Sequence, residues 1–291
     1  MSTPKNHHFL SKVLIKKFLD SDGKLNYYSK FEDRIINKEY SRFDFAEDFL
    51  NSIVDHNGLI DHKSVEDNLN QNFEQGFNRY YESFFSALKK EDNEMLTDSI
   101  KFMIRMGIIG DMRTPEHQIE TQYAIFNAFD KISHLADSKL QQEIEAYYSR
   151  VSVIKNKFPV DYNEIAEKIQ ELMSDCIYSV FLADDNNYFF LPDNSAVTIR
   201  SKLDSDIDFN GEILESLSRP ISTVIFPINS QTIIVSQSTK ICPQKSHGIY
   251  NLNSEAVFQY NKMFLASARD KVICAKNEYL QTFISKLGEE G

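Results

Sequence analysis

The chain has 291 residues, of which 42% are hydrophobic and 26% charged, and its formal net charge at pH 7 is -11. This composition is ordinary for a globular protein, and the negative charge argues against a general nucleic-acid coat protein, which needs a basic surface. Three cysteines without a C-x-x-C pair argue against a disulfide framework and a structural zinc site. No signal peptide or apolar membrane span is evident, so we expect a cytoplasmic protein without a membrane partner.

The charge is uneven along the chain. Residues 1–42 hold nine Lys and Arg against five Asp and Glu, a local net charge of +4, so the remainder carries -15. A basic segment beside an acidic body can steer a phosphate-bearing ligand. The alternative is that these lysines form a solvated face.

The apolar pattern predicts three regions. Residues 1–42 are predicted to form a short hairpin module with its turn at Gly23, between an apolar run at 13–19 and a strand at 25–28. Helical spacing then predicts five amphipathic helices, at 64–88, 93–110, 117–134, 138–155 and 162–176.

From residue 177 the pattern becomes strand-like. It predicts a hairpin of 177–182 with 188–191, a long acidic loop at 192–219, a hairpin of 222–226 with 232–236, a helix from Ser254, an apolar piece at 272–274 and a last helix at 276–287. The sum is an α+β fold in which a central helical bundle packs on a mostly antiparallel C-terminal sheet. Without a clear linker, we expect one interlocked domain over 1–291, made of the regions 1–42, 64–176 and 177–291.

Two adjacent histidines, His7 and His8, stand directly before an apolar run. Imidazole acts as an acid, a base or a metal ligand near neutral pH. Adjacent strand residues point to opposite faces, so at most one of the two enters a given pocket, and the sequence leaves open which. The alternative is a capping or buried structural histidine that donates to a backbone carbonyl.

Asp193 and Asn194 close an aromatic strand. A carboxylate there can orient a histidine, bind a metal or accept a proton, and the amide can donate to an oxyanion or a phosphate. The alternative is an Asx turn in which Asp193 caps its own loop.

Arg113 follows the helix at 93–110 and is the residue type that stabilises charge on a phosphate. The alternative is an ion pair with Glu116 or Glu120. Glu66 and Glu74 are eight residues apart, which places them on roughly one helix face.

Two such carboxylates with a nearby histidine are typical of a divalent-metal site, and the alternative is a solvated face. From these residues we predict Asp193 and Glu74 as ligands of Mg²⁺, and no other cofactor.

The order of short motifs along the chain is more specific than any one of them. The motifs are His-His-Phe-Leu at 7–10, Glu66-Asp67-x-Leu69 with Glu74, Arg113-Thr114-Pro115, Phe-x-x-x-Asp-Asn at 189–194, Ile-Phe-Pro-Ile at 225–228, and Leu252-Asn253. This order resembles domain-of-unknown-function family 4238, a bacterial family, over nearly the whole chain.

The family pattern is a His-x-x-Pro-like opening and a Thr-Ser-Asp-Asn-Pro signature. This chain departs from it at Ser11, Pro192 and Ser195, where the family usually has Pro, Ser and Pro. The residues that match are His7, His8, Arg113, Asp193 and Asn194. The resemblance implies a shared fold and a shared site at these five residues, and it implies no reaction.

The motifs favour a phosphodiester hydrolase, an RNA or DNA nuclease of the bacterial defence or toxin kind. In it His7 or His8 is the general acid or base, Asp193 orients it or binds metal, and Arg113 and Asn194 hold the phosphate of a nucleic acid or nucleotide. One alternative is a non-enzymatic interaction module, a sensor or inhibitor that binds a protein partner in a defence system. Another is a nucleotide-processing enzyme such as a glycosidase or transferase, which the sequence does not separate from the hydrolase. Convergence of these side chains in one pocket would discriminate between an enzyme and an interaction module.

Overall fold

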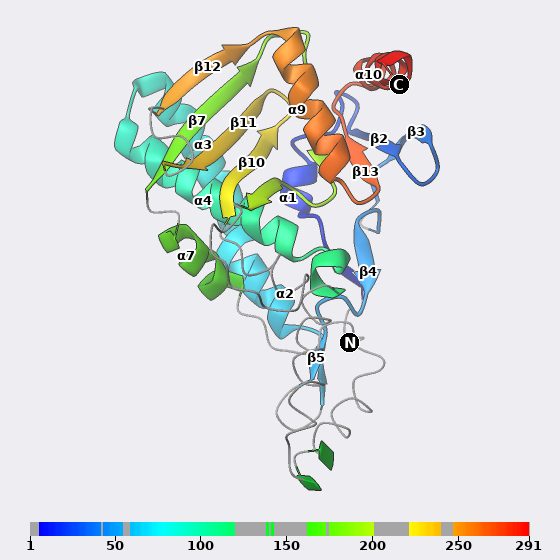
Figure 1. Cartoon of the computed structure of the whole chain (residues 1–291), viewed down its shortest axis with the longest axis vertical. Coiled ribbons are helices and arrows are strands. Elements are labelled where there is room, and N and C mark those ends of the chain that lie inside the picture. The colour runs from blue at the N-terminus through cyan, green and yellow to red at the C-terminus, as the bar shows by residue number, and fades with distance from the viewer. Residues whose placement is uncertain are drawn as a thin grey trace, which may run out of the picture.

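The structure is a computed structural model, and it describes residues 6–41, 43–54, 59–119, 138–139, 141–142, 162–172, 175–200, 221–239 and 247–290 (Figure 1). The helices in these ranges are α1 (Lys12–Ile15), α2 (Ser64–Leu69), α3 (Gln75–Lys90), α4 (Asn93–Met112), α7 (Tyr162–Leu172), α9 (Ser254–Ser267) and α10 (Asn277–Glu290). A π-helical turn, η1 (Asn70–Glu74), joins α2 to α3. None of the helices in the described residues combines the length and the apolar composition that crossing a bilayer requires.

The largest sheet has five strands in the order β12-β7-β11-β10-β9. They are β7 (Cys176–Ala183), β9 (Val197–Arg200), β10 (Ile221–Asn229), β11 (Thr232–Ser238) and β12 (Gly248–Leu252). Every neighbouring pair is antiparallel except β12 with β7, which is parallel. The predicted mostly antiparallel C-terminal sheet is therefore confirmed, and so is the hairpin that became β10 and β11.

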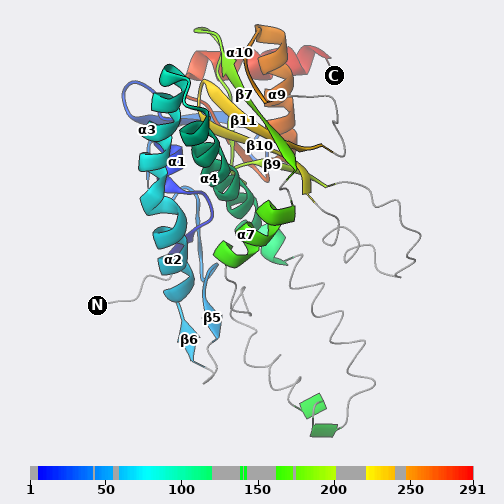
Figure 2. The same cartoon turned by 90° about the vertical axis from the view of Figure 1, so that its left-hand side faces the viewer.

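Helices cover both faces of this sheet. In Figure 2, α3 and α4 lie on one side of it and α9 lies on the other. The side chains of β10 alternate accordingly: Val224 and Phe226 join the hydrophobic core under α3 and α4, and Ile225 joins the core under α9 and α10. A strand buried on both faces is apolar at nearly every position, as β10 is. The α+β class predicted from the sequence is confirmed.

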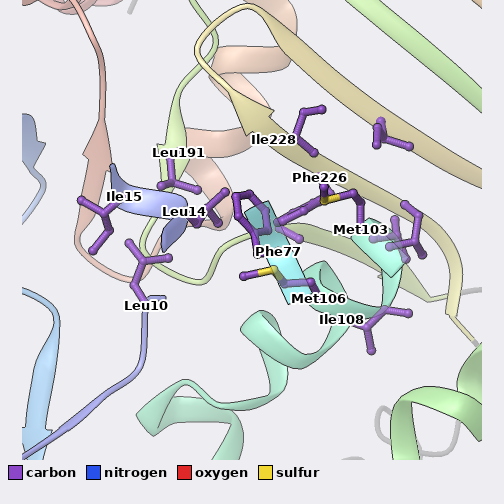
Figure 3. Close-up of a cluster of buried hydrophobic side chains, with 14 of the residues drawn as sticks. Leu10, Leu14, Ile15, Phe77, Met103, Met106, Ile108, Leu191, Phe226 and Ile228 are labelled. Carbon is purple, nitrogen blue, oxygen red and sulfur yellow. The ribbon is translucent and has the colours of Figure 1, made fainter. Parts of the chain in front are cut away.

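The core under α3 and α4 also receives the first helix. Leu14 and Ile15 of α1 belong to this core, and the close-up in Figure 3 shows Leu14 pointing toward Phe77 while Ile15 lies on the other side of α1. The α4 helix approaches the sheet closely at Gly107, where an added Cβ would lie 2.9 Å from the Phe226 ring. The absence of a side chain at Gly107 therefore lets α4 lie directly on the sheet.

A second sheet joins the two ends of the chain. It has the order β3-β2-β13-β8, with β2 (Lys24–Ser29), β3 (Arg34–Glu39), β8 (Leu191–Pro192) and β13 (Lys271–Ile273). Both pairings of β13 are antiparallel. Two short ribbons complete the strands, β1 (Asn6–His8) with β4 (Ala46–Asp48), and β5 (Ile53–Val54) with β6 (Ile60–Asp61).

The predicted hairpin at Gly23 is wrong. The run 13–19 contains α1 rather than a strand, and β2 pairs instead with β3. The buried residues Leu14, Ile15 and Phe18 have the i, i+1, i+4 spacing of one helix face, which decides the local structure. Gly23 does lie in a turn, with φ +76°, but that turn connects α1 to β2.

The predicted hairpin of 177–182 with 188–191 is also wrong. β7 pairs with β11 and β12, whereas residues 191–192 form β8 in the other sheet. The segment between them crosses from one sheet to the other because Phe189 and Phe190 are fully buried against α9 and α10.

The bounds predicted for the loop at 192–219 and for the helices after residue 116 agree only in part with the structure. Part of the predicted loop at 192–219 is strand, namely Pro192 in β8 and all of β9, and residues 201–220 lie outside the described residues. The helix predicted at 162–176 is confirmed as far as Leu172, but Cys176 begins β7. Most of the helices predicted at 117–134 and 138–155 lies outside the described residues.

Candidate functional site

The β1–β4 ribbon separates the two histidines. In its antiparallel register His7 lies opposite Glu47 and His8 opposite Ala46. Neighbouring residues of a strand project to opposite faces, so the two imidazoles face different surroundings. The structure thus places the two imidazoles in two separate environments, which are described in turn.

His7 points into the interior, where its side chain is only 1% exposed. Its Nδ1 accepts a hydrogen bond of 2.8 Å from the backbone N–H of Asn51. The side-chain amide of Asn51 continues the network, since its oxygen accepts a hydrogen bond from Gln118. His7 therefore fixes the backbone after β4. It is a buried structural histidine, as the alternative held, but its Nδ1 accepts a hydrogen bond from a backbone N–H, whereas the alternative had it donating to a backbone carbonyl.

His8 has a different environment, half-buried and beside charged groups. Burial, with Lys12 and Arg113 nearby, lowers the pKa of His8 to about 4, against the opposing influence of Glu74 and a backbone hydrogen bond at Phe45. Its imidazole is consequently neutral at pH 7. The carboxylate that acts on this imidazole is that of Glu74; Asp193 is not among the groups that shift its pKa.

Arg113 lies at the C-terminal end of α4 and is only 4% exposed. Its Nη2 donates to the backbone carbonyl of His8, and its Nη1 lies 3.3 Å from Oε1 of Glu74. The guanidinium therefore connects β1 to η1. Of the two partners considered from the sequence, Glu116 is paired with Arg269, and Glu120 lies outside the described residues. Its Nε is buried and has no hydrogen-bond partner among the described residues.

Glu74 owes its position to η1. The π-helical turn places its carboxylate against Arg113, whereas Glu66, in α2, accepts a hydrogen bond from the Asn51 side chain. π-turns occur often at functional sites. We predicted that the two glutamates share a helix face. Instead, Glu74 lies in the surroundings of His8, and Glu66 lies in the network that includes His7.

Asp193 is 2% exposed and bound entirely by backbone groups of a distant segment. Its Oδ1 accepts from the N–H of Arg269 at 2.8 Å, and its Oδ2 from those of Asp270 and Lys271, both at 2.9 Å. Burial raises the pKa of Asp193, and the three N–H donors oppose that rise. The carboxylate caps the turn before β13, so it is neither an Asx turn of its own loop nor directed at an imidazole.

Asn194 contacts the end of α4. Its Nδ2 donates to Oδ1 of Asp111 at 3.2 Å, and the Thr198 hydroxyl donates to the other Asp111 oxygen at 2.6 Å. Asn194 therefore joins the β8 end of the second sheet to the segment that carries Arg113.

Arg269 brings these two parts of the site together. Its side chain forms ion pairs with Glu47 of β4 and Glu116, while its backbone N–H donates to Asp193. The five predicted site residues therefore gather in one region of the fold. They do not form one pocket, since His7 and His8 face opposite sides and Asp193 is held by the backbone of 269–271.

The predicted metal ligands do not meet. Glu74 is paired with Arg113, and Asp193 is bonded to backbone N–H groups. Among the described residues there is no group of three or more His, Cys, Asp or Glu side chains that could hold a metal ion. The magnesium site stays a prediction.

Two residues of this region were not expected from the sequence, Lys12 beside His8 and Tyr40, on which Glu74 acts. Lys12, on α1, is one of the cations that lower the pKa of His8. Tyr40, directly after β3, has a hydroxyl that is buried without a hydrogen-bond partner among the described residues, and burial, Asp44 and Glu74 raise its pKa to about 12. Lys12 has a sequence signal, because it lies four residues after His8, and Tyr40 has none.

Comparison with known proteins gives one match. The family described as "Protein of unknown function (DUF4238)" matches residues 6–278, nearly the whole chain. No curated protein and no solved structure matches.

Proposed function

Because the chain belongs to the family of proteins of unknown function DUF4238, we propose its function from the geometry of the candidate site: it is a phosphodiester hydrolase, acting on RNA or DNA, whose site is formed by His8, Lys12 and Arg113. The class we propose is the bacterial defence or toxin nuclease, working in the cytoplasm. The free thiols of Cys176 and Cys274 support a reducing compartment.

The observation that carries this proposal is the surroundings of His8. A neutral imidazole lies beside two cations, and one of them, Arg113, is a buried guanidinium held in place by a carboxylate and a backbone carbonyl. Phosphoryl transfer needs positioned cations for the phosphate oxygens and a base for the nucleophile.

In the proposed reaction Lys12 and Arg113 hold the nonbridging phosphate oxygens. His8 takes a proton from a water molecule as the oxygen of that water bonds to phosphorus. The bond from phosphorus to the leaving alkoxide breaks, and solvent supplies a proton to the alkoxide while the imidazolium returns its own to solvent. The negative charge of the bound phosphate offsets the two cations, which raises the pKa of His8 and makes it a stronger base than in the free protein.

His7, Asp193 and Asn194 act in this proposal as positioning residues. They hold Asn51, the turn at 269–271 and Asp111, which surround the segments carrying His8 and Arg113. If Mg²⁺ takes part, Glu74 is the predicted ligand beside the site; comparing cleavage in EDTA with cleavage in added Mg²⁺ tests this prediction directly.

A second candidate is the non-enzymatic interaction module, a sensor or inhibitor that binds a protein of a defence system. The observation that favours it is the engagement of three of the five predicted catalytic residues, His7, Asp193 and Asn194, in holding up backbone or neighbouring side chains. On this view His8 and Arg113 serve the same purpose.

The deciding experiment is a cleavage assay with the purified full chain on single-stranded RNA, double-stranded DNA and an activated phosphodiester. We expect His8→Gln to lower kcat by at least 100-fold, the usual contribution of a general base, and Lys12→Ala to raise KM. Lys16→Ala is the matched control, because Lys16 is an exposed cation one turn away. Cleavage that survives His8→Gln, or no cleavage of any of the three, would favour the interaction module.

A further inference from the structure

The four strands at the outer edges of the two larger sheets differ in how they are protected. An unpaired edge exposes backbone N–H and C=O groups that can pair with another chain, and proteins usually block it with charged side chains, with proline or with a very short strand. β8 has only two residues, of which one is Pro192, and β9 has four residues and ends at Arg200. β3 is longer, but it carries the charged residues Arg34, Lys38 and Glu39.

β12 is the fourth edge strand, and it has none of these protections. Its sequence is Gly-Ile-Tyr-Asn-Leu, and residues 247–254 include no Lys, Arg, Asp, Glu or Pro. One edge of β12 pairs with β7, and none of the described residues pairs with the other edge, which lies on the outside of the sheet in Figure 1. Ile249 and Tyr250 are 50% and 43% exposed. This apolar, uncharged edge is therefore a surface to which another strand can add.

Aromatic side chains on the α9 side of the sheet continue as far as this edge. Phe181 of β7 contacts both Tyr260 of α9 and Tyr250 of β12, with ring centroids 5.6 and 5.4 Å apart. The Tyr250 side chain also lies over Gly248, where an added Cβ would overlap the Tyr250 hydroxyl. The aromatic layer thus ends at the sheet edge with a tyrosine that is nearly half exposed, so a strand added at this edge has to bring an apolar side chain to the same face.

We propose that the outer edge of β12 is a dimer interface, at which β12 of a second copy of this chain adds in antiparallel orientation. A two-fold axis at Tyr250 places the two copies of Tyr250 opposite each other. The same axis places Ile249 opposite Asn251, and Gly248 opposite Leu252. The two five-stranded sheets then become one continuous sheet.

Charge selects a second copy as the occupant of this edge. The chain has a net charge of -11, so an arbitrary contact between two copies is opposed by electrostatic repulsion. Residues 247–254 carry no Lys, Arg, Asp or Glu, so the two edges meet without placing like charges opposite each other. The second copy also brings an identical tyrosine to the place where the aromatic layer ends, and aromatic pairs across antiparallel strands are stabilising.

The proposed interface is separate from the candidate functional site. Thr198 of β9 donates a hydrogen bond to Asp111 near that site, and β9 lies at the opposite edge of the sheet from β12. Pairing through β12 therefore does not depend on the proposed hydrolase activity, and its test requires no cleavage assay.

The test measures the mass of the full chain in solution. Analytical ultracentrifugation and light scattering are recorded from about 1 to 100 μM, and the wild-type chain is expected to be a dimer at the upper end of this range. Ile249→Lys introduces a cation that pairing would bury near its own copy, so dimerisation should weaken about tenfold or more. Ile199→Lys is the matched control, because Ile199 is a 41% exposed isoleucine on β9, and it should leave the dimer unchanged.

Hydrogen exchange gives a second measurement, which decides the question if Ile249→Lys does not fold. The N–H groups of β12 that point away from β7 are unprotected in a monomer and hydrogen-bonded in the dimer. Their exchange in the wild-type chain should therefore slow as the protein concentration rises. The N–H groups of β9 are the internal comparison, and their exchange should not change with concentration.

The outcomes distinguish this interface from other occupants of the edge. A wild-type dimer that is weakened by Ile249→Lys and not by Ile199→Lys supports it. A wild-type chain that stays monomeric over the whole range overturns it and leaves the edge to an extended segment of a different protein. A dimer that Ile249→Lys leaves unchanged, or that both lysine variants weaken equally, forms through another surface and also overturns it, as does exchange in β12 that is independent of concentration.

Discussion

Arg113 donates a hydrogen bond from its guanidinium to the backbone carbonyl of His8, which joins two residues 105 positions apart in the sequence. The same guanidinium is paired with Glu74, so the end of α4, the strand β1 and the turn η1 meet at one buried cation. This arrangement fixes the backbone of residue 8, and with it the place from which the imidazole projects.

The pKa of His8 is expected to respond to Lys12. NMR titration of the His8 ring should give a midpoint of about 4 in the wild-type chain. Lys12→Ala removes a cation that disfavours the imidazolium, so the pKa should rise toward its ordinary value of about 6.5. Lys16→Ala should leave it where it is. A wild-type midpoint near 6.5 would contradict the burial and charge described for this residue.

The free energy of unfolding should depend on pH through the imidazole of His8. The pKa of His8 is lower in the folded chain than its unfolded value of about 6.5, so the unfolded state binds a proton first as pH falls. The stabilisation from His8 is therefore present above pH 6.5 and is lost between about 6.5 and 4. Urea unfolding at several pH values should show this loss in the wild type and a smaller one in His8→Gln; equal slopes in both would contradict it.

Asp193 is expected to matter for stability rather than for chemistry. Asp193→Asn places an amide N–H₂ group against backbone N–H donors and removes the charge that three of them bind, so we expect a loss of about 2–3 kcal/mol in the free energy of unfolding. Hydrogen exchange should accelerate at Arg269, Asp270 and Lys271.

The matched control for that variant is Asp185→Asn, at an exposed turn position, with an expected change within about 0.5 kcal/mol. If Asp193→Asn retained full stability and unchanged exchange but lost cleavage, Asp193 would be acting in the reaction, as the sequence predicted.

Glu74 is expected to stabilise the fold through Arg113. Glu74→Ala leaves a guanidinium that is 4% exposed without its carboxylate, and removing one partner of a buried pair typically destabilises by about 3–5 kcal/mol. Because Glu74 itself is partly exposed, with 22% of its side chain accessible, we expect the lower half of that range. Chemical denaturation measures it, and Glu82→Ala, an exposed position on α3, should be nearly neutral. A neutral Glu74→Ala would mean that Arg113 needs no counter-ion.

Gly110 should tolerate no side chain. A Cβ there would overlap the Cβ and Oγ of Ser195, which itself has a left-handed φ of +67°. We expect Gly110→Ala to destabilise by about 2 kcal/mol or more, as other overpacked sites do, and Ser195→Gly to rescue it, because glycine removes the clash and adopts that φ without strain.

The control for Gly110 is Gly288, where an added Cβ meets nothing within 4 Å. Gly288→Ala in α10 should raise the midpoint of thermal unfolding, since alanine is favoured over glycine in a helix by about 1 kcal/mol. If the double variant Gly110→Ala, Ser195→Gly were no more stable than Gly110→Ala alone, the clash would not be the cause.

Much of the fold could be predicted because its signals are local. The helices α4 and α9 have an Asn or Asp cap and a helical apolar period, and β10 with β11 has two apolar runs around a short polar turn. The hairpins predicted at Gly23 and at 184–187 are wrong because a turn signal does not say what the turn connects. In each case there is a turn, but it does not join two paired strands: the turn at Gly23 follows the helix α1, and β2 pairs with the next strand, β3, whereas the strand after 184–187 is β8, whose partner β13 lies far away in sequence.

The candidate site was predicted less well, because its contacts are long-range. The sequence identified His8 and Arg113, which lie near each other, but it could not give Glu74 as the carboxylate beside them in place of Asp193. Three backbone N–H groups bind Asp193 from a turn 76 to 78 residues away. Because every residue except proline carries a backbone N–H, a hydrogen bond to such a group leaves no recognisable pattern in the sequence.

The position of β13 between β2 and β8 affects how this protein folds during its synthesis on the ribosome. β2 is synthesised early, but β13, which pairs with one edge of β2, is synthesised about 240 residues later. At a synthesis rate of about 5–20 residues per second, the nascent chain spends more than about ten seconds with that edge uncovered. A ribosome that stalls before residue 269 leaves β2 without β13, and leaves Asp193 without the three backbone N–H donors that bind it.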